Sequence, residues 1–97
     1  MRALVALADP QRRRILEMLS KGELPSGEIA ARFAISASAV SQHLKVLKEA
    51  GLITERRSGT RRLYAANPQA LGELRAAIEA MWQEALGGMA AALEQER

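Results

Sequence analysis

The sequence predicts a mainly α-helical fold with one small β-hairpin, in which four helices precede the hairpin and one long helix follows it. Apolar residues recur every three or four positions over most of the chain, which is the spacing of helices that bury one face. Aromatic residues make up only 3% of the chain although 48% is apolar, so small aliphatic side chains must build the core, as in packed helices. Between residues 52 and 65 the pattern changes to two strand-like runs around a turn at Gly59.

The composition bounds the class of protein. The 97 residues make a single domain, residues 1–97, near the lower size limit for a self-sufficient core. The absence of cysteine excludes disulfides and thiolate metal sites. No apolar run approaches the roughly 20 residues that cross a bilayer, and the N-terminus lacks the pattern of a secretory signal. We therefore expect a cytoplasmic protein that does not insert into membranes.

Charge is divided between the two parts of the chain. Residues 1–67 carry twelve Lys or Arg against six Asp or Glu, whereas residues 68–97 carry two against five. The first part can meet phosphates and the second should avoid them. The alternative is chance segregation on a small protein.

The first two helices are predicted over residues 2–8 and 10–20. The first reads RALVALA and is almost wholly apolar, so another element must cover it. Asp9 as N-cap and Pro10 at the first helical position start the second helix. Three successive arginines at 12–14 fan over more than half of its circumference, and for each of them a structural role is favoured over a phosphate contact.

A helix-turn-helix arrangement is predicted over residues 26–51. Ser26 caps a short helix at about residues 27–33, whose Phe33 fills the core, and a tight turn at 34–36 follows. The next helix carries its apolar stripe at Val40, Leu44 and Leu47. Ser36 or Ser38 can cap its start, and Gly51 can end it in the left-handed conformation. Two helices joined by such a turn form the helix-turn-helix motif.

The polar face of this second helix suits the DNA major groove, because short side chains at its N-terminal end allow close approach of the backbone. The alternative is an ordinary solvated helix face. For DNA, we expect base contacts from Ser38, Ser41, Gln42 and His43. His43 can alternatively pack at the edge of the core or donate to a phosphate. Phosphate contacts are expected from Ser36, Lys45, Arg56, Arg57, Arg61 and Arg62.

The hairpin is predicted from strands at residues 52–57 and 61–65 around Ser58-Gly59-Thr60. Four arginines in seven residues load its tip, offset only by Glu55. A basic hairpin directly after a recognition-type helix is the layout of a wing that rests on the DNA backbone or enters the minor groove. The alternative is a solvated hairpin kept soluble by its arginines. Leu63 and Tyr64 are expected to anchor it to the core.

The last helix is predicted from Pro68 to Glu94, roughly 40 Å long at 1.5 Å per residue. Its apolar stripe exceeds what the small core can cover, and the first helix also needs cover, so a symmetric dimer is expected. In such a dimer, residues 10–67 form the DNA-binding core and wing, and residues 1–8 and 68–97 form the dimerisation helices. The alternative is a back-folded monomer bent at Gly87-Gly88. The expected interface residues are Leu4, Val5, Leu74, Ile78, Met81, Trp82, Ala85 and Met89.

With these residues assigned, the chain resembles a winged helix-turn-helix regulator of the ArsR/SmtB family. The resemblance covers nearly the whole sequence. It is carried by ALADPQRRRILEML at residues 6–19, by SASAVSQHLKVLKEAGLI at 36–53, which is the most specific stretch, and by RRSGTRRLY at 56–64. The resemblance implies a three-helix core, a wing, a long dimerisation helix and a homodimer that represses promoters until a signal arrives.

The chain departs from the metal-sensing members of the family that it resembles. Those members use a cysteine pair, or His and Asp ligands on the last helix, whereas this chain has no cysteine, one histidine (His43) and one aspartate (Asp9). We therefore expect the metal-independent branch, with no metal site and no cofactor. Three alternatives stay open for the effector: a small apolar ligand between the last helices, a membrane or protein partner that sequesters the dimer, or none.

The leading hypothesis is a sequence-specific DNA-binding transcriptional regulator, a homodimeric repressor whose partner is double-stranded DNA with an inverted-repeat operator. The alternative is a winged-helix protein-interaction module without sequence-specific DNA binding, whose basic hairpin grips an acidic partner. An enzyme is not expected, because the sequence has no glycine-rich phosphate loop or paired-carboxylate motif, and its one aspartate serves as a cap.

Overall fold

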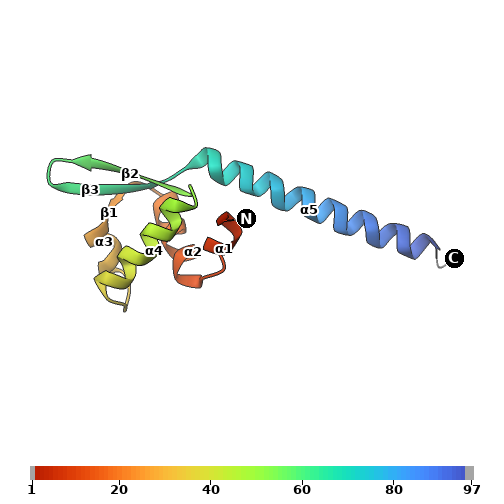
Figure 1. The fold of residues 1–97 in the computed structure, drawn as a ribbon, viewed down its shortest axis with the longest axis horizontal. Helices are drawn as coiled ribbons and strands as arrows, with labels where there is room; N and C mark the ends of the chain where they lie inside the picture. The colour runs from red at the N-terminus through yellow and green to blue at the C-terminus, as the bar shows by residue number, and fades with distance from the viewer. Residues whose placement is uncertain (1, 96–97) are drawn as a thin grey trace.

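The computed structural model describes residues 2–95 and has the predicted architecture, a helical body with a hairpin and a long final helix. The hairpin leaves the body at one end and the last helix at the other, so the molecule is 66 Å long (Figure 1). The elements are α1 (Arg2–Ala6), α2 (Pro10–Ser20), β1 (Leu24–Pro25), α3 (Ser26–Ala31), α4 (Ala37–Glu49), β2 (Ile53–Ser58), β3 (Arg61–Ala66) and α5 (Pro68–Gln95).

The predicted start of α2 is confirmed. The side chain of Asp9 accepts hydrogen bonds from the backbone N–H groups of Gln11 and Arg12 at 2.7 and 3.2 Å. The arginines of α2 take structural roles, as predicted. The guanidinium of Arg12 donates to the carbonyl of Ala6, and that of Arg13 donates to the carbonyl of Leu7 at 2.7 Å. These bonds satisfy carbonyl groups that the end of α1 leaves without helical partners.

The segment before α3 differs from the prediction. Leu24 and Pro25, for which no strand was predicted, form a short strand, β1, which pairs with Tyr64 and Leu63 of β3, so the sheet order is β1-β3-β2. This pairing holds Pro25 extended directly before the helix, and Pro25 therefore occupies the N-cap position. Ser26, predicted as the cap, is instead the first residue of α3, and no side chain caps this helix. Both α1 and α3 end two residues earlier than predicted.

The boundaries of α4 follow local signals that the sequence shows. The hydroxyl of Ser36 accepts a hydrogen bond from the backbone N–H of Ala39 at 3.1 Å, which caps the helix. At the other end Gly51 has φ +77°, and its N–H donates to the carbonyl of Lys48 at 2.9 Å. The next N–H, from Leu52, donates to the carbonyl of Leu47 at 3.0 Å. These two bonds form a Schellman motif, which turns the chain straight into β2.

Asn67 joins the end of α4, the base of the hairpin and the start of α5. Its backbone N–H donates to the carbonyl of Leu52 at 2.9 Å, and its side-chain amide donates to the carbonyl of Gly51 at 3.1 Å. The side-chain oxygen of Asn67 accepts from the N–H of Ala70 at 3.4 Å and so caps α5. The direction in which α5 leaves the body is therefore tied to the end of α4.

The core lies between α2, α3, α4, the hairpin base and the first turns of α5. The predicted stripe of α4, Val40, Leu44 and Leu47, is fully buried in it. Tyr64 anchors the hairpin, as predicted, while Leu63 is half-buried. The predicted core filler Phe33 is also half-buried, packs against this core and carries the guanidinium of Arg14 4.9 Å from its ring centre. The buried residues are Ala6, Ile15, Leu16, Leu19, Ile29, Val40, Leu44, Leu47, Leu52, Ile53, Tyr64 and Leu74.

The substitution Gly51→Ala tests the Schellman motif. A Cβ at this position meets no atom within 4 Å, so the cost comes from the left-handed backbone alone. We expect the free energy of unfolding in urea to fall by about 1 kcal/mol. Gly72→Ala is the matched control, because Gly72 lies within α5, also has open space around it and lacks a positive φ. This control should be neutral or stabilising, by up to about 1 kcal/mol. Equal effects of the two substitutions would contradict the assignment.

Candidate nucleic-acid interface

The exposed face of α4 carries short polar side chains. Because Val40, Leu44 and Leu47 face the core, the helical repeat turns Ser38, Gln42 and Lys45 to the opposite side, where all three are exposed. Ser41 is exposed on the flank that faces the hairpin and lines the groove between the two elements. The N-terminal half of α4 therefore presents hydroxyl and amide groups with no large apolar side chain among them.

His43 is separated from this polar face. It is half-buried on the other flank of α4 and lies near Asp9 at the start of α2. Burial raises the pKa of the Asp9 carboxyl, but two backbone N–H groups, the nearby His43 and the Arg12 guanidinium together hold this pKa below its ordinary value. The structure thus groups three of the four expected base-contact residues and sets His43 apart, in line with the alternative that it packs at the edge of the core.

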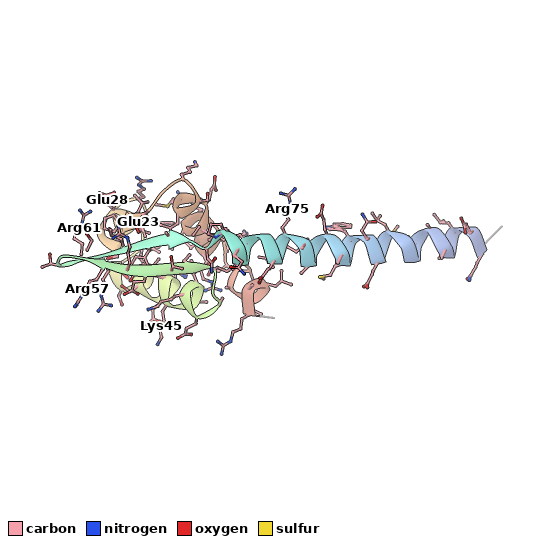
Figure 2. All side chains as sticks on the ribbon, turned by 90° about the horizontal axis from the view of Figure 1, so that it is seen from above. Glu23, Glu28, Lys45, Arg57, Arg61 and Arg75 are labelled. Atoms are coloured by element: carbon pink, nitrogen blue, oxygen red, sulfur yellow. The ribbon has the colours of Figure 1, made fainter. Side chains whose placement is uncertain are left out.

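The two faces of the hairpin carry different arginines. Glu55 pairs with Tyr64 and Arg57 pairs with Arg62 across the strands, so these four side chains share one face. By the same alternation Arg56 and Arg61 belong to the other face. In Figure 2, Arg57 points to the same side as Lys45, whereas Arg61 points to the side of Glu23 and Glu28. The four arginines expected to hold phosphates are therefore divided between two sides of the wing.

Arg56 is engaged within the chain. Its Nε and Nη2 atoms each donate to a carboxyl oxygen of Glu23 at 2.7 Å. The hydrogen bond from Arg56 lowers the pKa of Glu23, and the same bond raises the pKa of Arg56. This bidentate pair fastens β2 to the residue before β1. Sequence reasoning missed Glu23, because 33 residues separate it from Arg56 and no local pattern links them.

Glu55 joins α4 to the hairpin. Its Oε2 accepts a hydrogen bond from Lys48 Nζ at 3.0 Å, and its Oε1 lies 3.4 Å from Arg62 Nη1. The bond from Lys48 is the main reason that the pKa of Glu55 is lowered. Burial and the neighbouring Glu55 raise the pKa of the Tyr64 hydroxyl. A groove of about 300 Å³ lies at this junction, lined by Ser41, Leu44, Lys45, Lys48, Glu55, Arg62 and Tyr64.

Three of the expected phosphate-binding cations remain available. Among residues 2–95, Lys45, Arg57 and Arg61 form no ion pair, and all three are exposed. Lys45 and Arg57 lie on the same side as the polar face of α4. Ser36 is exposed at the helix start, although its hydroxyl already caps α4. The resulting surface combines hydrogen-bonding groups on a helix with cations beside it, which is the chemistry that base edges and phosphates require.

The apolar stripe of α5 is exposed. Leu74, expected at a dimer interface, is instead only 8% exposed in the core of its own chain, and it is the one buried residue of this helix. Beyond it α5 leaves the body (Figure 1), and Trp82 is 62% exposed. Of the expected residues of α1, Val5 is 67% exposed while Leu4 is half-buried. The exposed large apolar side chains are Val5, Ile78, Met81, Trp82, Leu86, Met89 and Leu93.

Two further features of the described chain bear on the site. In residues 2–95 no three His, Cys, Asp or Glu side chains gather in the way that a metal ion would need. None of the helices described here combines the length and the apolar character that a membrane crossing demands.

Comparison with known proteins agrees with this geometry. Residues 9–55 match the family of bacterial regulatory proteins called arsR. The chain is 47% identical over 95 residues to the HTH-type transcriptional regulator Rv2034 of Mycobacterium tuberculosis. The aligned region covers 98% of this chain and 89% of that protein. It is 41% identical over 66 residues to the transcriptional repressor SdpR of Bacillus subtilis, covering 68% of this chain and 73% of SdpR.

Solved structures share the fold. The crystal structure of a possible transcriptional regulator for arsenical resistance has a TM-score of 0.78 at 45% identity, covering 84% of this chain and 85% of that chain. The homodimeric winged helix-turn-helix DNA-binding domain of Mb0332 from Mycobacterium bovis has a TM-score of 0.69 at 33% identity, covering 88% of this chain and 79% of that chain.

Proposed function

This chain belongs to the ArsR family of bacterial regulatory proteins and is a transcriptional regulator rather than an enzyme, and from that premise we propose that it is a homodimeric repressor of an inverted-repeat operator. The observation that carries the proposal is the shared orientation of α4 and the wing. Lys45, which lies on the polar face of α4, and Arg57 of the hairpin, which forms no ion pair within residues 2–95, point to the same side of the molecule (Figure 2). A DNA duplex lying on that side meets hydrogen-bonding groups and cations together.

In this proposal α4 enters the major groove. Ser38, Ser41 and Gln42 read base edges, and Gln42 can pair bidentately with adenine. Lys45 and Arg57 hold phosphates, with Ser36 at the helix start, whereas Arg62 is held by Glu55. Arg61 reaches the backbone or the minor groove from the tip of the wing. Arg56 contributes less than these residues, because its guanidinium is already paired with Glu23.

Dimerisation is proposed through α1 and α5, so that residues 10–67 serve DNA binding and residues 1–8 and 68–97 serve assembly. The exposed stripe of α5 supports this, since contiguous apolar patches mark interaction surfaces. The homodimeric state given for the Mb0332 domain supports it as well. A twofold dimer would present two α4 helices to half-sites about 34–36 Å apart along the duplex.

Repression and metal independence are also part of the proposal. The relative SdpR is described as a transcriptional repressor, which supports the same direction of control here. The chain has no cysteine and a single histidine, which supports a regulator that senses no metal. Acting on a bacterial chromosome, such a regulator would work in the cytoplasm. Its release from DNA would then be triggered by a small molecule or by a protein or membrane partner, or it would need no effector at all.

The substitution Gln42→Ala tests base reading. Selection from random duplexes with the wild-type protein should enrich a palindrome, and the variant should lose discrimination at one base pair per half-site, worth about 1–3 kcal/mol. Gln69→Ala is the control, because Gln69 lies on α5 and is exposed. An unchanged profile for Gln42→Ala would make the base-reading assignment wrong. Failure of the wild-type protein to enrich any duplex would favour a protein-interaction module instead.

The substitution Arg57→Ala tests the wing. Removing a phosphate contact should weaken binding to all duplexes alike and reduce the slope of log K against log salt by about 1. Arg75→Ala makes the same chemical change on α5, away from the hairpin (Figure 2), and should leave the slope unchanged. Fluorescence anisotropy over a salt series measures both. Equal slopes for Arg57→Ala and the wild-type protein would remove Arg57 from the interface.

The substitution Met81→Glu tests the dimer. A carboxylate in the apolar stripe of α5 should shift sedimentation equilibrium toward the monomer by at least about tenfold in Kd. Ala80→Glu adds the same charge one residue earlier, on the side of the helix that faces away from the centre of the apolar stripe, so the dimer should persist. A wild-type protein that stays monomeric at micromolar concentration would rule out the assembly.

A further inference from the structure

Glu55 is the only carboxylate in residues 53–66 and lies where α4 meets the wing. Each of its oxygens faces one cation: Lys48 of α4 at 3.0 Å and Arg62 of β3 at 3.4 Å. Its side chain is only 17% exposed, in the groove beside Tyr64. Within residues 2–95, Glu55 is therefore the one side chain whose ion pairs link α4 to both strands of the hairpin.

The arrangement of cations around Glu55 explains why a carboxylate matters there. Arg57 and Arg62 are directly opposed on β2 and β3, which is an unfavourable pairing of like charges. Lys48 and Arg62 flank the groove that also contains Lys45. Without Glu55, both would be free to bind the phosphates of any duplex. Cations that bind phosphates of any sequence raise non-specific affinity and leave discrimination unchanged or lower.

We propose that Glu55 is a specificity-determining positioning residue, which fixes the wing relative to α4 and withholds Lys48 and Arg62 from sequence-independent phosphate binding. This inference rests on the proposed function of α4 and the hairpin in DNA binding. The lowered pKa of Glu55 agrees with this geometry, because its main cause is the hydrogen bond from Lys48. Glu55 itself touches no base, and it acts on specificity through the two cations and through the orientation of the wing.

The substitution Glu55→Gln tests the proposal, because it removes the charge while keeping the size of the side chain. Affinity is measured over a salt series for the duplex selected by the wild-type protein and for a random-sequence duplex. We expect tighter binding of the random duplex and a salt slope steeper by about 1–2, since each newly bound phosphate adds about 0.9. The ratio of specific to non-specific affinity should fall by at least about fivefold.

Glu49→Gln is the matched control. Glu49 lies on the exposed side of the same helix, and its side chain forms no ion pair within residues 2–95. This variant has the same net charge as Glu55→Gln, so it separates total charge from position. Its affinities for the two duplexes should shift together and leave their ratio unchanged. If Glu49→Gln lowers the ratio as much as Glu55→Gln does, net charge explains the effect and the proposal is overturned.

A second variant, Lys48→Gln, breaks the same contact from the side of α4. Because this variant removes a cation, the ratio of specific to non-specific affinity should fall without a steeper salt slope. The test remains usable even if circular dichroism shows that Glu55→Gln folds poorly. An unchanged ratio in Lys48→Gln and in folded Glu55→Gln overturns the role of Glu55 while leaving the DNA-binding function intact. A wild-type protein that prefers no duplex overturns the proposed function and this inference together.

Discussion

The burial of Val40, Leu44 and Leu47 is the constraint on which the rest of the structure depends. These three side chains fix the rotation of α4 about its own axis, since any rotation would expose apolar surface worth about 1.5–3 kcal/mol per side chain. The position of Gln42 on the outer face follows from that rotation. The Schellman motif at Gly51 then leads directly into the buried Leu52, so the hairpin starts at a fixed point relative to the helix.

The ion pairs of the wing act on orientation more than on stability. The pairs formed by Glu23 and Glu55 are largely exposed on their basic sides, and such solvent-exposed pairs add little to stability. Their geometry is nevertheless specific, because Arg56 binds Glu23 through two parallel bonds and Glu55 meets two elements at once. A two-stranded hairpin has few apolar contacts of its own, so these pairs restrict its tilt against the body. The arginines left outside the pairs are the ones available to a polyanion.

The sequence predicted the features that depend on local chemistry. The Asp9 cap, the Ser36 cap, the left-handed Gly51 and the hairpin turn at Gly59 each involve neighbours within a few residues, and all are present. The misses depend on pairing between distant segments. β1 exists because Leu24 meets Tyr64, 40 positions along the chain, and the pair of Glu23 with Arg56 spans 33 positions. No periodicity within one segment contains that information.

The junction at Asn67 would make the proposed assembly and the proposed DNA binding parts of one geometry. Residues 75–95 of α5 have no buried residue of their own, and an isolated helix with exposed apolar side chains gains most of its stability from a partner. Asn67 ties the start of this helix to the carbonyl groups of Gly51 and Leu52, at the point where α4 ends. The angle at which two copies of α5 meet would therefore fix the angle between two copies of α4. A signal that changes the packing of α5 needs no contact with DNA, because the three hydrogen bonds of Asn67 would carry the change to α4 and to the base of the wing.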